Sequence, residues 1–177
     1  MANCFRVGIV RLKQMKILTT DFNKICAQSR EEYLTGECCG LLTWVPTKST
    51  VNVHLCVNLQ NTMHRRDPER FPRTNLNAYL IDPGEQLAII SEAEKNGGGL
   101  AGFYHSHVDC DAYFSQEDKD QACALFGDEP TYPDAVYLVV SVYGSRSSNS
   151  EPSIHGHKCF AWDGDALDFI EVPLKLV

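Results

Sequence analysis

Two histidines and an aspartate are spaced so that they could hold one metal ion. His105 and His107 stand one residue apart in a strand-like run, Gly102 to His107. Alternate side chains of an extended strand share a face, so both imidazoles would face one ion while Ser106 points away. Asp118 follows after a loop and would add a carboxylate. Three protein ligands that leave a fourth position for water are typical of catalytic zinc, so the pattern predicts a Zn²⁺ hydrolase site.

Ser115 stands where a helix is expected to begin, three residues before Asp118. A serine at this position caps a helix by accepting a hydrogen bond from a first-turn amide. Asp118 would then lie in the first turn, close to the strand end that carries the histidines. The same hydroxyl could also donate a hydrogen bond to the oxyanion that forms when water adds to a carbonyl. We expect Ser115 to serve as cap, as oxyanion donor, or as both.

Other potential ligands fit a metal site less well. A second His-x-His pair, His155 and His157, has no carboxylate at a suitable spacing, so we interpret it as loop and strand-edge residues. Asp109 and Asp111 lie close to the first pair. They are either further ligands or solvated charges outside the first coordination sphere, and the sequence leaves both readings open.

The elements that must position these residues alternate between helices and strands. We expect a helix capped by Thr19 or Thr20 and ended by Thr35-Gly36, a second from Asp82 to Lys95, and a third from Ser115. Such interleaving predicts an α/β fold, a mixed, curved β-sheet flanked by about three helices, with residues 1–177 as one domain. Strands are expected near residues 37–44, 51–57, 78–81, 102–107, 135–142, 158–162 and 167–172.

The segment from Asn58 to Asn77 is long, polar and basic. It contains two prolines and four arginines, Arg65, Arg66, Arg70 and Arg73. Its length favours a binding loop or lid over a simple turn. A solvated, partly mobile insertion is the alternative.

The same residues resemble a known family. His-x-His, seven residues, then Ser-x-x-Asp is similar to the JAMM motif of the MPN+ (Mov34/JAB) zinc metalloproteases. Upstream, the run from Glu37 to Leu42 resembles the strand of that family that begins with a glutamate and Cys-Gly. Asn61 with Ile81-Asp82-Pro83, and the strand Tyr137 to Val142, also fit, so the likeness covers roughly residues 15–145. Many members have proline after the second histidine, where this chain has Val108.

The resemblance implies a single MPN-type domain with a defined set of roles. His105, His107 and Asp118 would hold zinc, Glu37 would be the general base, and Ser115 would stabilise the oxyanion. The small prokaryotic members process ubiquitin-like sulfur-carrier proteins after a Gly-Gly tail, which implies such a protein as substrate, bound by its C-terminal tail. An isopeptidase that releases a ubiquitin-like modifier from lysine, and a non-catalytic MPN scaffold, are the alternatives. Without the resemblance, Glu37 would be interpreted as a surface carboxylate at a strand start.

Composition favours a soluble cytoplasmic enzyme. A net charge of −7 gives no basic surface for nucleic acid, and no apolar run reaches the ~18 residues of a membrane span. No secretory leader is recognisable at the N-terminus. The eight cysteines are therefore expected to be reduced thiols rather than a disulfide framework. Self-association remains open.

Overall fold

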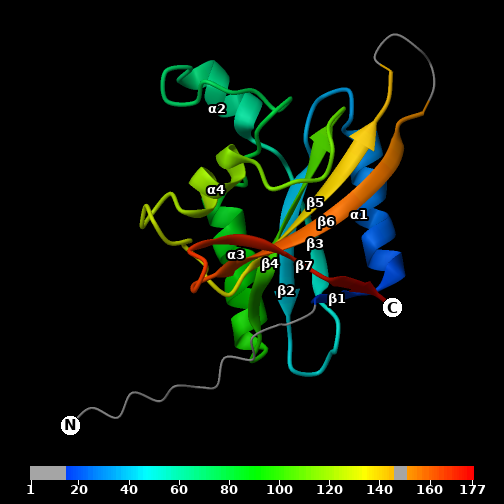
Figure 1. The fold of residues 1–177 in the computed structure, drawn as a ribbon, viewed down its shortest axis with the longest axis vertical. Coiled ribbons are helices and arrows are strands. Elements are labelled where there is room, and N and C mark those ends of the chain that lie inside the picture. The colour runs from blue at the N-terminus through cyan, green and yellow to red at the C-terminus, as the bar shows by residue number, and fades with distance from the viewer. Residues whose placement is uncertain (1–14, 146–150) are drawn as a thin grey trace.

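A six-stranded mixed sheet forms the frame of the molecule (Figure 1). The computed structural model of the chain describes residues 15–145 and 151–177. The strand order is β3-β2-β4-β5-β6-β7, in which β4 and β5 are parallel and every other neighbouring pair is antiparallel. The strands are β2 (Cys39–Trp44), β3 (Asn52–Cys56), β4 (Gly99–Val108), β5 (Val136–Tyr143), β6 (Ser153–Asp163) and β7 (Asp168–Val172).

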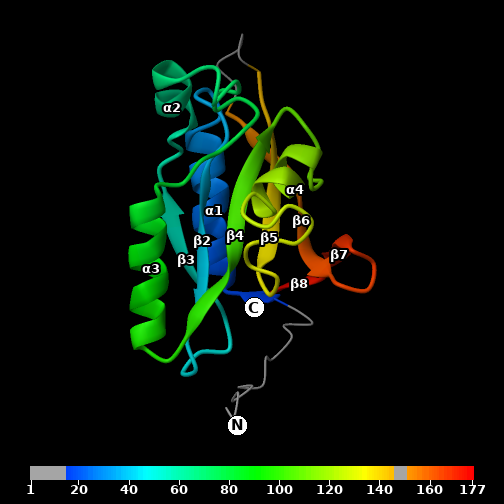
Figure 2. The ribbon, with the colours of Figure 1, turned by 90° about the vertical axis from the view of Figure 1, so that its left-hand side faces the viewer.

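Helices cover both faces of this sheet, as Figures 1 and 2 show. Helix α1 (Thr19–Glu31) buries Phe22, Ile25 and Cys26 in one core, and α3 (Pro83–Lys95) and α4 (Gln116–Ala122) pack into a second core on the opposite face. Successive side chains of a strand point to opposite faces of the sheet, so each central strand contributes residues to both cores. On β5, Leu138 and Val140 belong to the α1 side, whereas Tyr137 and Val139 belong to the α3 side. The prediction of an α/β fold built on a mixed sheet is confirmed.

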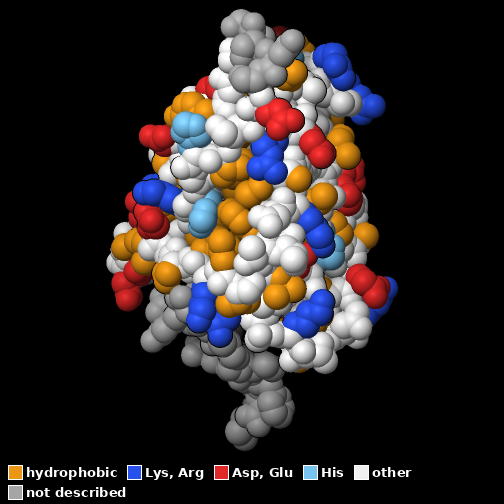
Figure 3. Space-filling model, turned by 90° about the vertical axis from the view of Figure 1, so that its right-hand side faces the viewer, with side chains coloured by type: hydrophobic (Ala, Val, Ile, Leu, Met, Phe, Trp, Pro, Cys, Tyr) orange, Lys and Arg blue, Asp and Glu red, His pale blue; other side chains and the backbone are white. Residues whose placement is uncertain are grey.

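Hydrophobic side chains reach the surface on the α1 side of the molecule (Figure 3). Figure 3 views the molecule from the side of α1 and β6 and shows hydrophobic side chains gathered near the middle of this face. Half-buried side chains that pack against the α1-side core include Ile154 and Ala161 on β6 and Val172 on β7.

Several predicted boundaries and elements are wrong. Thr19 and Thr20 lie inside α1, whose N-cap is Leu18 without a side-chain cap, and the helix ends at Glu31 instead of reaching Thr35-Gly36. Residues 78–81 form no strand, because Leu80 exchanges hydrogen bonds with the Asn58 side chain and the Leu59 backbone instead of a sheet edge. A fourth helix, α2 (Gln60–Arg66), lies in the polar 58–77 segment, whose sequence has no apolar periodicity that would predict a helix.

The C-terminal part also differs from expectation. Strand β6 starts at Ser153, five residues before the predicted start, because its residues from Ser153 to Ala161 pair with β5. A short strand β8 (Leu174–Leu176) pairs in parallel with β1 (Met15–Ile17) and so brings the two ends of the described chain together. The predicted Ser-rich loop at 144–152 lies partly outside the described residues.

Two predictions from composition can be set against the structure. The described cysteines all carry free thiols, and those on β2, β3 and β6 are buried. In the described part of the chain, no helix combines the length and apolar character that crossing a bilayer requires.

Candidate metal centre

Strand β4 presents His105 and His107 on the face covered by α3 and α4. Both side chains are buried, and their Nε2 atoms lie 3.2 Å apart. Ser106 points the other way, where its Oγ accepts a hydrogen bond from the Cys38 amide on the neighbouring strand segment. Val108 is the last residue of β4 and pairs with Val142 of β5. The predicted division of the two strand faces is therefore present.

The first turn of α4 brings Asp118 to the same point. Ser115 is the N-cap of α4, and it forms a capping box with Asp118 in which its Oγ accepts from the Asp118 amide. The Ser115 amide and hydroxyl both donate to Asp118 Oδ2, at 2.8 and 2.6 Å. This leaves Asp118 Oδ1 facing His105 Nε2 at 3.2 Å, while Oδ2 lies 3.6 Å from His107 Nε2. Ser115 thus orients the carboxylate that it caps.

The three side chains have the geometry and chemistry of a metal-ligand set. Their ligand atoms lie within 4.8 Å of one another, and no other such group of three occurs in the described ranges. Ligand atoms at ~2.0–2.1 Å from a tetrahedral zinc are separated by about 3.3 Å. The two histidine Nε2 atoms lie 3.2 Å apart, Asp118 Oδ1 lies 3.2 Å from His105 Nε2, and Asp118 Oδ2 lies 3.6 Å from His107 Nε2, which is close to this spacing. A buried group of ionisable side chains is costly unless it is paired or binds a metal, so the donor set fits Zn²⁺.

Neighbouring groups shift the pKa values of two of these side chains. Burial alone would raise the pKa of Asp118, but attraction to His105 and hydrogen bonds from His105, His107 and Ser115 hold that pKa well below its usual range. Burial likewise opposes the charged form of His107, yet the hydrogen bond to Asp118 and the charge of Glu37 raise its pKa. Metal ligands must be deprotonated, so a cation bound here would compete with protons for His107 and Asp118.

The two imidazole rings are held by different means. His107 Nδ1 lies 3.0 Å from the backbone oxygen of Asp111, a bond that places the proton on Nδ1 and leaves the Nε2 lone pair for a metal. His105 Nδ1 is the one buried side-chain nitrogen or oxygen without a hydrogen-bond partner in the described part of the chain. Its ring instead stacks on Tyr79, with ring centroids 4.6 Å apart. Tyr79 is therefore the contact that orients His105.

Glu37 lies buried just before β2, with 6% of its surface exposed. The interpretation of this residue as a surface carboxylate is wrong. Burial raises the pKa of Glu37 to about 8, an effect opposed by the charge of His107 and reinforced by that of Asp118. A cation bound beside it would favour the carboxylate form. Glu37 is thus a buried acid or base next to the ligand cluster and outside it.

The 58–77 segment holds the Glu37 backbone on both sides. The Glu37 amide donates to Asn75 O at 2.7 Å, and Asn58 Nδ2 donates to Glu37 O at 2.9 Å. Further along the segment, Arg73 forms an ion pair with Glu117 at 2.8 Å, next to Asp118 in the first turn of α4. The ends of this segment are consequently tied to the candidate site. Whether it binds a partner stays a prediction.

The side chains of the weaker candidate ligands contact other partners. The Asp109 carboxylate accepts from Tyr33 Oη at 2.9 Å, and Asp111 Oδ1 accepts from Tyr143 Oη. His155 and His157 belong to β6, where their rings pack against Tyr143 and Phe22 respectively. None of the four belongs to the ligand cluster, which consists of His105, His107 and Asp118.

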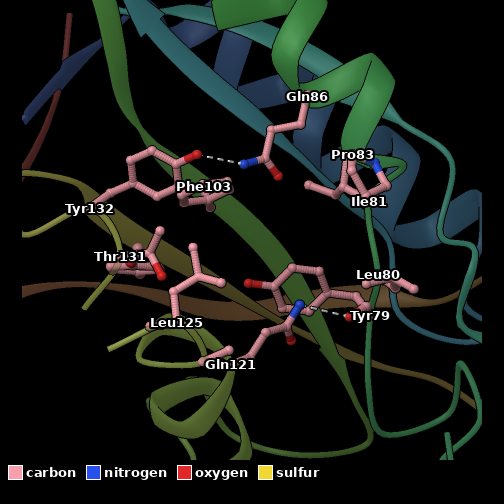
Figure 4. A pocket seen from close by; sticks show the side chains of 13 residues that line it. Tyr79, Leu80, Ile81, Pro83, Gln86, Phe103, Gln121, Leu125, Thr131 and Tyr132 are labelled. Atoms are coloured by element: carbon pink, nitrogen blue, oxygen red, sulfur yellow. Dashed lines mark hydrogen bonds between the residues drawn. The ribbon is translucent and has the colours of Figure 1, made fainter. Parts of the chain in front are cut away.

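A pocket of about 380 Å³ lies behind Tyr79, between the start of α3 and the end of α4 (Figure 4). Tyr79, Phe103 and Leu125 line it, and a hydrogen bond from Gln86 to Tyr132 Oη crosses its wall. The Tyr79 carbonyl accepts from Gln121 Nε2 at 3.0 Å, so α4 also helps to fix the ring that stacks on His105.

Three residues of the site were not predicted from the sequence: Tyr79, Asn58 and Asn75. Tyr79 was placed in a strand, and nothing in its neighbourhood signals a contact with a histidine 26 residues later. Asn58 directly follows the β3 region, where asparagine is common because its side chain satisfies turn backbone. That signal was present, but it predicts a turn and not a link to Glu37.

The comparisons with known proteins agree with this architecture. The Haloferax volcanii protein named desampylase is 29% identical over 98 residues, 55% of this chain and 57% of the relative, so the match spans little more than half of that relative. Two solved structures share the fold and cover 92% of both chains. One is a Desulfitobacterium hafniense protein (TM-score 0.59, 24% identity), the other a Salinibacter ruber protein (TM-score 0.55, 22% identity).

A family model described as prokaryotic homologs of the JAB domain matches residues 20–154. The match runs from α1 into β6 and so includes Glu37, both histidines of β4, Ser115 and Asp118. It covers more than half of the chain. This chain therefore belongs to the prokaryotic JAB-domain family, whose JAMM motif it carries.

Proposed function

We propose that the protein is a zinc-dependent hydrolase that cleaves the amide bond after the C-terminal tail of a ubiquitin-like protein. The observation that supports this most directly is the buried cluster of His105, His107 and Asp118, with ligand atoms 3.2 to 3.6 Å apart and Glu37 buried beside it. When bound, zinc lowers the pKa of water and polarises a carbonyl. The chain itself must supply the base, the oxyanion contact and the substrate groove.

Glu37 is proposed to move the proton. Its carboxylate accepts a proton from the attacking water as the oxygen adds to the scissile carbonyl carbon. The same proton then passes to the leaving nitrogen as the carbon–nitrogen bond breaks, so one water is consumed and Glu37 returns to its carboxylate form. Glu37 is buried beside the ligand cluster, where a bound cation would favour its carboxylate form, the form that accepts a proton.

Ser115 is proposed to have two duties. Its hydroxyl carries one proton, which in this structure is donated to Asp118 Oδ2 at 2.6 Å. To donate to an oxyanion, the hydroxyl must turn away from Asp118, whose Oδ2 then keeps the bond from the Ser115 amide. The hydroxyl proton is therefore donated either to Asp118 Oδ2 or to the oxyanion, whereas the helix cap uses the same oxygen as acceptor from the Asp118 amide.

The substrate class is proposed from the relative and the site together. One relative, from Haloferax volcanii, is named desampylase, and this chain belongs to the prokaryotic JAB-domain family. We propose a ubiquitin-like or sulfur-carrier protein as substrate for this chain, with an isopeptide bond to lysine as the second candidate bond. The presence of every ligand argues against a non-catalytic scaffold. We further propose that residues 1–177 act as one domain in the cytoplasm, where buried free thiols such as Cys38 persist.

We expect cleavage directly after a Gly-Gly pair. Glycines suit the position because they have no side chains to collide where the backbone approaches the metal. The probes are ubiquitin and a prokaryotic sulfur carrier, each extended past Gly-Gly by a short peptide, together with a lysine-linked ubiquitin conjugate. Replacing the final glycine by valine should block cleavage and leave binding of the globular part largely unchanged. Mass spectrometry of products and calorimetric titration of the valine probe measure the two effects.

An unstructured peptide with the same tail is the matched control. Efficient cleavage of that peptide, or of the valine probe, would contradict the proposed specificity and leave the zinc chemistry standing. Preference for the lysine-linked conjugate over the linear extensions would identify the enzyme as an isopeptidase.

A further inference from the structure

We infer that Asn58 is a positioning residue that holds the base Glu37 and the ring stacked on His105 in one hydrogen-bonded unit. The inference rests on the proposed function for its effect on turnover. Its effect on the metal centre follows from the structure of the site alone. Asn58 stands between β3 and α2 and is buried, with 8% of its surface exposed.

The first arm of Asn58 reaches Glu37. Asn58 Nδ2 donates to Glu37 O at 2.9 Å, while the Glu37 amide donates to Asn75 O at 2.7 Å. Asn75 is fixed in turn by a reciprocal pair with Asn61, in which each side-chain oxygen accepts the other's amide. Both backbone polar groups of Glu37 are therefore bound to the 58–77 segment and not to a sheet neighbour. The position of its carboxylate depends on that segment.

The Asn58 side chain also binds the backbone on both sides of Tyr79. Nδ2 also donates to Ala78 O at 3.1 Å, and Oδ1 accepts from Leu80 N at 3.1 Å. The residues before and after Tyr79 are thus bound to one side chain. Oδ1 accepts in addition from Gln60 N at 2.9 Å, so both protons and both acceptor positions of the amide are used.

Tyr79 transmits this placement to the metal centre. Its ring stacks on His105, whose Nδ1 has no hydrogen-bond partner among the described residues. Metal-bound histidines are ordinarily oriented by a bond from their second nitrogen. Here the stacked Tyr79 ring orients His105 instead. Asn58 and Gln121 bind the backbone around Tyr79 and so hold its ring in place. One buried amide therefore sets the distance between the base and a ligand.

The test replaces Asn58 with aspartate, a side chain of the same shape. Asn58→Asp keeps the oxygen that accepts from Leu80 and Gln60, but it loses both donated bonds and faces two carbonyl oxygens with a negative charge. We expect kcat to fall about 10- to 100-fold with KM changed less than about threefold, since supporting groups around a metal site contribute on this scale. We also expect zinc affinity to fall about tenfold, and the visible absorption bands of the cobalt-substituted protein to shift.

Gln28→Ala is the matched control. Gln28 is also a buried amide, with 8% exposed, but it lies on α1 across the sheet and bonds Cys56 O and Tyr104 Oη. It should lower the melting temperature without changing turnover per bound zinc or the cobalt spectrum. If Asn58→Asp does not fold, the same measurements are made on Asn58→Ser.

The possible outcomes distinguish the positioning role of Asn58 from the proposed hydrolase function. An Asn58 variant that behaves like Gln28→Ala, less stable but with unchanged cobalt bands, zinc affinity and kcat, would overturn the positioning role. If the wild-type protein cleaves none of the ubiquitin-like probes, the proposed function fails. The cobalt spectrum and the zinc affinity then still decide whether Asn58 positions the metal centre.

Discussion

Replacing Glu37 with glutamine is expected to lower kcat by about 10²- to 10⁴-fold, the range of general acid–base contributions, while one zinc per chain is retained. Glutamine has the size of glutamate but cannot accept the proton of the attacking water. Because Glu37 lies outside the cluster formed by His105, His107 and Asp118, the metal should remain bound. The variant therefore separates proton transfer from metal binding.

Loss of folding should not account for this effect. Burial raises the pKa of Glu37 to about 8, above the ~4.3 of an unfolded chain. In the metal-free protein, the contribution of Glu37 to the free energy of unfolding therefore decreases as the pH rises from the pKa of the unfolded chain to the pKa of the folded protein. Glutamine removes that pH dependence. Turnover and zinc content measured on the same sample decide the role, and a comparable loss of zinc would make Glu37 a ligand or a structural residue.

Replacing His107 with alanine is expected to abolish stoichiometric zinc binding and, with it, activity. His107 Nε2 lies 3.2 Å from His105 Nε2 and 3.6 Å from Asp118 Oδ2, so its removal leaves only two of three ligands. Elemental analysis of protein purified without chelator measures the effect directly.

His155→Ala is the matched control for this experiment. His155 belongs to the second His-x-His pair but packs against Tyr143 on β6, outside the cluster. This variant should keep one zinc per chain. If His107→Ala retains its zinc, the ligand assignment is wrong. If His155→Ala loses it, the second pair has a role in metal binding that the structure does not show.

The grouping of the ligand residues could be predicted because each step is local. Alternation along β4 places His105 and His107 on one face, and N-capping by Ser115 places Asp118 in the first turn of α4. Only the meeting of the strand end with the helix start requires the fold, and the spacing of the family motif implied it. A continuous apolar run at 135–142 likewise predicted β5, and the capping residues Asp82, Pro83 and Glu85 predicted the start of α3.

The residues that support the site depend on contacts distant in sequence. Residues 78–81 have the composition of a strand, but their backbone bonds to Asn58 and Leu59 and sends the Tyr79 ring to His105. Helix α2 is short and polar, so no hydrophobic pattern reveals it. Hydrogen bonds between side chains and backbone, such as that from Asn58 to Glu37, leave no periodic trace in a sequence.

Zinc titration of the metal-stripped protein shows whether one bound ion at the three-ligand site is required for cleavage. The three-ligand site predicts that cleavage of the ubiquitin-like probe is absent without metal, rises in proportion to added zinc, and saturates at one ion per chain. Full activity in the stripped protein, or saturation at a different stoichiometry, would contradict the account.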